Sequence, residues 1–77
     1  MNFSDDILTK SEKKDMLLKY KRQLKRNLQT LAYISSIELD AETENNSVSE
    51  DILNLKNSVQ RHIINLTEKI NYYNALL

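Results

Sequence analysis

Residues 52–77 read ILNLKNSVQRHIINLTEKINYYNALL, and this stretch decides the fold. Apolar side chains recur in it at intervals of three or four residues, which is the repeat of one face of an α-helix. They are Ile52, Leu55, Val59, Ile63, Leu66, Ile70, Tyr73 and Leu77. The pattern predicts a helix over about residues 48–76, with a length of roughly 45 Å at ~1.5 Å per residue.

A second apolar stripe lies in the first half of the chain. It consists of Leu17, Tyr20, Leu24, Leu28 and Leu31, extended by Ile34 and Ile37. Thr9 and Glu12 have the spacing of a capping box, in which the threonine hydroxyl accepts from a backbone N–H of the first turn and the glutamate reaches back to the N–H of the cap. These features predict a helix over about residues 9–39. Ser4 is an alternative cap that would add a short extra helix at the N-terminus.

A polar, acidic segment, residues 40–46, separates the two predicted helices. Asn45 and Asn46 are the residues best suited to a left-handed backbone in a chain without glycine. Ser47 and Glu50 form a second potential capping box, which would begin the next helix after Ser47. We therefore predict an all-α, single-domain antiparallel hairpin of two helices. One continuous coiled-coil helix is the alternative, and the polar break argues against it.

The composition excludes several kinds of site. The 77 residues include no cysteine, glycine or proline and only one histidine, His62. Disulfides, zinc–thiolate centres and glycine-rich phosphate loops are therefore impossible. The acidic residues Glu42, Glu44, Glu50 and Asp51 have no apolar pocket around them in the sequence, so we interpret them as solvated. We expect no enzymatic activity, no cofactor and no metal.

A chain of this size buries only a small core, so association is the expected source of additional stability. Leu53, Ile64, Tyr72 and Leu76 lie off the main stripe of the second helix and widen its apolar arc beyond what one neighbouring helix covers. We therefore expect the hairpin to be completed by another protein or by a second copy. The predicted partner-binding residues are Leu55, Val59, Ile63, Leu66, Ile70, Tyr72, Tyr73, Leu76 and Leu77.

The charges are segregated along the chain although the net charge is zero. Residues 10–26 contain eight basic side chains, and residues 38–51 contain six acidic and no basic ones. A basic helix face made of Lys21, Arg22, Lys25 and Arg26 could bind phosphates, so a small nucleic-acid-binding regulator is an alternative function. The other interpretation of this face is a solvated surface, and a homo-oligomeric structural bundle is a third alternative.

The chain combines three elements: the acidic-apolar start Ser4-Asp5-Asp6-Ile7-Leu8, the leucines Leu17, Leu18, Leu24 and Leu28, and the segments Ile63-Ile64-Asn65 and Ile70-Asn71-Tyr72-Tyr73. In this layout it resembles the needle-subunit co-chaperones of bacterial type III secretion systems. The resemblance spans nearly the whole chain and rests on layout. It implies a bacterial helical hairpin that joins a helical-repeat chaperone and keeps a secreted helical subunit monomeric. No apolar run reaches membrane-spanning length and residues 1–10 do not resemble a signal peptide, so we expect a cytoplasmic protein.

Overall fold

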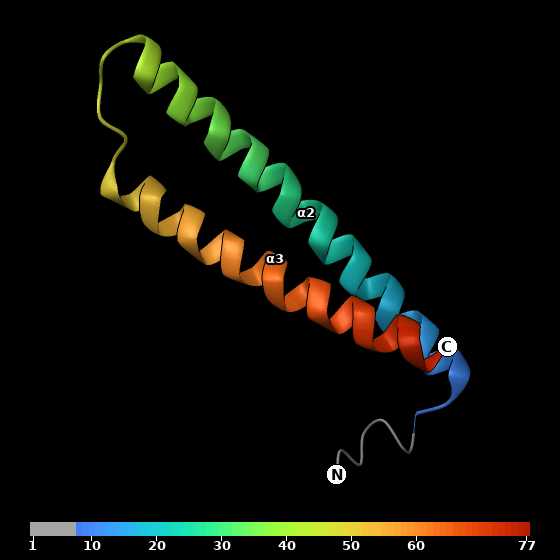
Figure 1. Ribbon diagram of the computed structural model, residues 1–77. Helices are drawn as coiled ribbons and strands as arrows, with labels where there is room; N and C mark the ends of the chain where they lie inside the picture. Colours follow the sequence, from blue (N-terminus) through green and yellow to red (C-terminus); the bar gives the residue numbers. More distant parts are fainter. Residues whose placement is uncertain (1–7) are drawn as a thin grey trace.

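The computed structural model describes residues 8–77, which form two antiparallel α-helices joined by one connection (Figure 1). Helix α2 spans Lys10–Thr43 and helix α3 spans Glu50–Leu76. The 34 residues of α2 nearly span the longest dimension of the molecule, 54 Å. The predicted all-α two-helix hairpin is confirmed. The alternative cap Ser4 and the extra N-terminal helix that depends on it lie outside the described residues.

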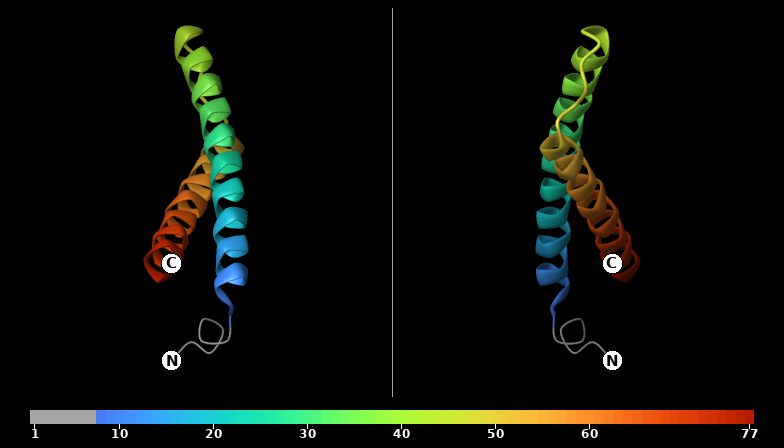
Figure 2. Two further views of the ribbon diagram at one scale, coloured as in Figure 1. Left: turned by 90° about the vertical axis from the view of Figure 1, so that its right-hand side faces the viewer. Right: turned by 90° about the vertical axis from the view of Figure 1, so that its left-hand side faces the viewer.

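Each helix turns one continuous stripe of side chains toward the other, and we call these the inner stripes. Every member is buried or half-buried, and the spacing alternates between three and four residues throughout. The inner stripe of α2 is Leu17, Tyr20, Leu24, Asn27, Leu31, Ile34, Glu38 and Ala41; that of α3 is Ile52, Lys56, Val59, Ile63, Leu66, Ile70 and Tyr73. This 3.5-residue repeat is typical of helices that pack as a left-handed coiled coil. Figure 2 shows the two helices crossing at an angle.

Three predicted stripe positions are exposed. Leu28 is 48% exposed and Leu55 is 43% exposed, and the inner positions beside them are occupied by Asn27 and Lys56. Leu77 follows the last residue of α3 and is 40% exposed, and half-buried Ile37 lies beside the inner position of Glu38. The Asn27 side-chain amide donates to the Gln23 carbonyl oxygen at 2.8 Å, within α2. Because a strict 3.5-residue repeat selects the position and not the residue type, a polar side chain faces inward while the adjacent leucine faces solvent.

The predicted cap at the start of the first helix is confirmed. Thr9 has an extended backbone, and its hydroxyl oxygen accepts from the Glu12 backbone N–H at 3.1 Å. The Glu12 carboxylate accepts from the Thr9 hydroxyl at 3.2 Å, in place of the predicted bond to the cap N–H. One of the donor groups left open at the helix start is therefore satisfied locally.

The first helix continues four residues past the predicted end, to Thr43, and the connection is correspondingly shifted. Continuing the helix keeps Ala41 half-buried on the inner stripe. The helix then ends on Asn45, whose φ of 57° is left-handed as predicted. The Asn46 N–H donates to the Ala41 carbonyl oxygen at 2.8 Å, and the Asn45 N–H donates to the Glu42 carbonyl oxygen at 3.2 Å. This pair of bonds is a Schellman motif, built on asparagine because glycine is absent.

The cap of the second helix is Ser49 and not Ser47 as predicted. The Ser49 hydroxyl oxygen accepts from the Ile52 backbone N–H at 3.4 Å. The shift follows from the later end of α2, which leaves residues 46–49 as the extended part of the connection. Glu50 and Asp51 then occupy the first turn of α3, where their negative charges interact favourably with the helix dipole.

The core is small, and its buried cluster lies at the open end of the hairpin, where the start of α2 lies beside the end of α3 (Figure 1). Leu17, Ile70 and Tyr73 form its buried cluster. Partly buried neighbours complete it: Leu8, Met16, Tyr20 and Leu24. Toward the turn, Ile34 is fully buried, and Val59 and Leu66 are the other buried apolar residues of the described chain.

Candidate interaction surface

The structure divides the predicted partner-binding residues into two groups. Four of them, Val59, Leu66, Ile70 and Tyr73, are buried against α2 and belong to the core of the hairpin itself. Ile63 is half-buried on the same inner stripe. Four others are at least 40% exposed: Leu55, Tyr72, Leu76 and Leu77. Only this second group is accessible to another molecule while the hairpin is closed.

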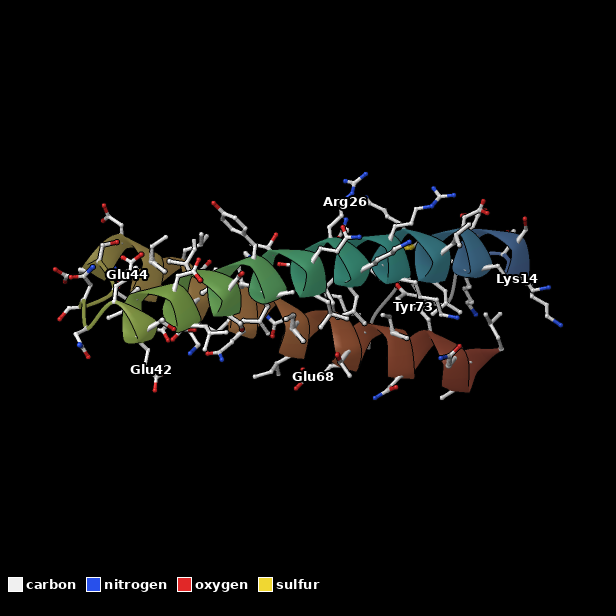
Figure 3. The ribbon with its side chains drawn as sticks, turned by 90° about the horizontal axis from the view of Figure 1, so that it is seen from above. Lys14, Arg26, Glu42, Glu44, Glu68 and Tyr73 are labelled. Atoms are coloured by element: carbon white, nitrogen blue, oxygen red, sulfur yellow. The ribbon has the colours of Figure 1, made fainter. Side chains whose placement is uncertain are left out.

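An aromatic cluster supports the exposed residues at the open end. The Tyr73 ring lies 5.8 Å from the Tyr20 ring on α2 and 5.3 Å from the Tyr72 ring in an edge-to-face arrangement. Lys69 Nζ lies 5.2 Å from the centre of the Tyr20 ring, within the range of a cation–π interaction. Figure 3 shows Tyr73 between the two helices. Tyr72 is therefore held by a buried neighbour while 45% of its own surface is exposed.

Exposed apolar residues outnumber buried ones in the described part of the chain. Ten large apolar side chains are at least 40% exposed, against six that are buried. The exposed ones are Leu18, Leu28, Tyr33, Leu39, Leu53, Leu55, Ile64, Tyr72, Leu76 and Leu77. Single exposed apolar residues are normal on a protein surface, but an excess over the buried set is typical of a chain that has a further binding partner.

The predicted partner-binding residues did not include α2, yet the solvent side of this helix carries a second regular stripe, which we call the outer stripe. Its members are all exposed and again alternate at three and four residues: Leu18, Lys21, Lys25, Leu28, Ala32, Ser35, Leu39 and Glu42. A shallow, mainly apolar depression of about 440 Å³ lies on its first half and is lined only by residues of α2. Leu18, Leu28 and Leu39 all belong to this three-and-four-residue repeat, so the outer stripe could have been found from the sequence.

The basic residues of the predicted nucleic-acid face are all exposed: Lys21, Arg22, Lys25 and Arg26. None of them forms an ion pair, because the only salt bridge within the described residues joins Lys56 Nζ to a Glu38 carboxylate oxygen at 3.0 Å. In Figure 3, Arg26 points away from α3, and Lys14 lies at the opposite end of the molecule from Glu42 and Glu44. The charge segregation of the sequence is therefore also a segregation in space.

A second depression, of about 410 Å³, lies between the helices on the side of Arg26. It is lined by Gln23, Arg26, Asn27, His62, Asn65, Leu66 and Lys69. His62 is exposed beside it. Among residues 8–77, no group of three or more histidine, cysteine or acidic side chains is arranged to hold a metal ion. The two depressions are open surface features and not enclosed sites.

No helix within residues 8–77 combines the length and the apolar character needed to cross a bilayer. Comparisons with protein-family models, with curated proteins and with solved structures found no match to this chain. The class of protein is therefore defined by the geometry alone: a two-helix hairpin with an incompletely covered apolar surface.

Proposed function

We propose that this protein is a small adaptor or co-chaperone that binds another protein through its exposed apolar residues. The observation that carries the proposal is the excess of exposed over buried large apolar side chains in the described chain. Removing apolar surface from water contributes about 25 cal/mol per Å², so each covered leucine adds to the stability of a complex.

The contact surface in this proposal is the open end of the hairpin. Tyr72, Leu76 and Leu77 are exposed there next to the buried cluster of Leu17, Ile70 and Tyr73. An interface is strongest where exposed anchor residues stand on a rigid support, because less freedom is lost on binding. The inner-stripe members of the predicted set act indirectly, by holding α3 in place.

The layout resemblance suggests what kind of partner this could be. In that version of the proposal, the hairpin acts in the bacterial cytoplasm with a helical-repeat chaperone. Together they cover the apolar face of a secreted helical subunit until export. A helix laid into an apolar groove or against another helix is a common mode of such recognition. The resemblance alone supports this finer assignment.

Capture of a binding partner tests the proposal directly. We expect Leu76→Glu to abolish recovery of the partner with tagged protein, since it places a charge in the contact surface. Asn74→Glu, at an exposed position in the same turn, is the matched control and should leave recovery unchanged. Both variants should retain the helical circular dichroism of the parent. Equal recovery by all three proteins would reject the open end as the contact surface.

For the finer assignment, a purified secretion needle subunit is the probe. The hairpin, with its chaperone, should keep that subunit monomeric in light scattering at concentrations where it otherwise polymerises. Unchanged polymerisation would reject the secretion role while leaving a different protein partner open.

A second candidate function is nucleic-acid binding by the basic face of α2. It is favoured by the exposure of Lys21, Arg22, Lys25 and Arg26, none of which forms an ion pair with any of residues 8–77. Such binding should weaken steeply with salt, because each neutralised phosphate releases counterions. Loss of a salt-dependent mobility shift of duplex DNA or RNA on joint substitution of Arg22→Glu and Arg26→Glu would support this function, and no shift with the parent protein would reject it.

A further inference from the structure

The outer stripe of α2 is separate from the open-end surface, and the order of its residues indicates which molecule binds to it. We propose that two copies of this chain associate through their outer stripes, with the two α2 helices antiparallel about a two-fold axis. This inference goes beyond the proposed function, which uses the other helix and the other end of the hairpin. It rests on the order of residue types along the stripe, all of which are exposed.

The stripe is self-complementary in one antiparallel alignment. With the two-fold axis between Ala32 and Ser35, Leu28 of one copy lies opposite Leu39 of the other, and Ala32 lies opposite Ser35. Leu28 and Leu39 are 48% and 62% exposed, so association of the two copies would bury apolar surface of both side chains. The small side chains at the axis allow the two helix backbones to approach closely, which brings the flanking leucines into contact.

Charge complementarity selects a second copy over an unrelated helix. In the same alignment Lys25 lies opposite Glu42 of the other copy, and two-fold symmetry creates this pair twice. Neither residue forms an ion pair within its own described chain. Beyond them, Lys21 of one copy approaches the acidic turn of the other, which contains Glu44 and Glu50.

The opposite orientation is disfavoured by the same charges. In a parallel pair Lys21 and Lys25 would face their own copies, and Glu42 would face Glu42. Like charges in register across an interface repel, whereas the antiparallel arrangement places the basic half of each α2 against the acidic half of the other. The segregation of charge along a chain of zero net charge is thereby accounted for.

The shallow depression on the stripe fits this arrangement. Its lining residues are Lys21, Leu24, Lys25, Leu28, Gln29 and Ala32, which lie at positions i, i+3, i+4, i+7, i+8 and i+11. Four side chains at i, i+3, i+4 and i+7 form the hole that receives one side chain of a packed helix. The depression is thus two consecutive holes, and the facing segment of the second copy, around Leu39 and Glu42, supplies the side chains that enter them.

A charge exchange tests the dimer with the full-length chain. Sedimentation equilibrium of Lys25→Glu alone, or of Glu42→Lys alone, should show a dimer Kd about tenfold or more higher than that of the parent, because each change disrupts two symmetric pairs. The double variant Lys25→Glu/Glu42→Lys should return the Kd to within about threefold of the parent value, since the pairs are restored with reversed sign. A monomeric parent, or a double variant as weak as the singles, would overturn the proposal.

A matched exchange on another face of α2 is the control. Arg26→Glu/Asp40→Lys and its two single variants alter exposed residues with the same charges and a similar separation. All three should leave the dimer Kd unchanged. Dimerisation that responds equally to this set would place the interface elsewhere.

Disulfide cross-linking determines the relative orientation of the two α2 helices. Because the chain has no native cysteine, only the introduced cysteines can form disulfides. In the antiparallel alignment, Ala32→Cys chains mixed with Ser35→Cys chains should form disulfide-linked heterodimers faster than either variant links with itself. Faster self-linking of each variant would indicate a parallel pair and reject the assigned alignment.

The proposed dimer and the proposed partner binding at the open end can be tested independently of each other. Lys25→Glu should weaken the dimer and leave recovery of a heterologous partner through Leu76 intact, whereas Leu76→Glu should do the reverse. Loss of the dimer alone, or of partner recovery alone, therefore identifies which surface has been assigned incorrectly.

Discussion

The two ends of the hairpin are held together by different interactions. At the open end, Leu17, Ile70 and Tyr73 form a buried cluster that continues into the Tyr20 ring. Near the turn, two inner positions are occupied by Glu38 and Lys56, whose side chains are 30% and 31% exposed and meet at 3.0 Å. A cluster of buried apolar side chains therefore lies where the start of α2 meets the end of α3, whereas near the connection a partly exposed ion pair stands on the inner stripe beside buried Ile34 and Val59.

The difference shows where the hairpin obtains its stability. A partly exposed ion pair contributes little, roughly 0–1 kcal/mol, whereas a buried leucine or isoleucine contributes several times that amount. Toward the turn, burial of Ile34 and Val59 is joined by local bonds: the Schellman motif at Asn45 and the cap at Ser49. Leu39, Leu53 and Leu55 remain exposed near this end, which leaves apolar surface there for association.

The largest expected effect is at the open end. Ile70→Asp should unfold the hairpin at 25 °C, because it buries an uncompensated charge and removes a core side chain at a cost of about 4 kcal/mol or more. Circular dichroism at fixed protein concentration measures the loss of helix. Ile64→Asp, at a position 58% exposed on the same helix, is the control and should retain the fold. A folded Ile70→Asp protein would show that the open-end cluster does not hold the hairpin together.

Toward the turn, Ile34→Ala should lower the free energy of unfolding by about 3 kcal/mol, because Ile34 is fully buried and its truncation leaves a cavity. Leu39→Ala, 62% exposed five residues later, should change it by less than about 0.5 kcal/mol in dilute protein. Urea denaturation compares the two variants. Similar losses for both would mean that Leu39 is covered under the conditions used.

Mutation of the two candidate cap residues of α3 distinguishes the observed start of this helix, after Ser49, from the predicted start, after Ser47. Ser49→Ala should cost about 1 kcal/mol, because the Ile52 N–H loses its acceptor, whereas Ser47→Ala should cost only a few tenths. Thermal denaturation of the two variants beside the parent measures the difference. A larger loss of stability from Ser47→Ala than from Ser49→Ala would indicate that the helix begins after Ser47, as predicted.

The smallest effect is expected at the ion pair. Glu38→Gln should lower the free energy of unfolding by about 0.5 kcal/mol or less, and the loss should shrink further in about 1 M salt. Replacing both residues, as Glu38→Leu/Lys56→Leu, should instead raise stability, since it extends the apolar inner stripe through the turn end. Urea denaturation at low and high salt checks both changes. A large loss from Glu38→Gln would show that the ion pair, and not apolar burial, holds the turn end.

Most of the fold could be predicted from local patterns. The apolar periodicity around Leu17 and Ile70 identified the two helices, and Thr9 and Asn45 marked two of their ends. The errors were local: the extension to Thr43, the cap at Ser49, and the choice of inner residue at three positions, where Asn27, Glu38 and Lys56 face inward. The candidate surface was predicted in part: the exposed Tyr72–Leu77 end was in the predicted partner-binding set, whereas of the outer stripe of α2 only Lys21 and Lys25 were predicted, as part of a nucleic-acid face.

The sequence by itself determined that the chain forms two helices with a polar connection, because helix periodicity, capping and the missing glycine and proline act within a few residues of one another. Only the tertiary structure decided that Asn27 and Lys56 face inward beside exposed Leu28 and Leu55. Adjacent residues on a helix differ by about 100°, so periodicity alone leaves two candidates for each inner position. Packing against the facing helix decides which of the two residues points inward, because it imposes a 3.5-residue repeat and brings Lys56 to Glu38, 18 residues away in the chain.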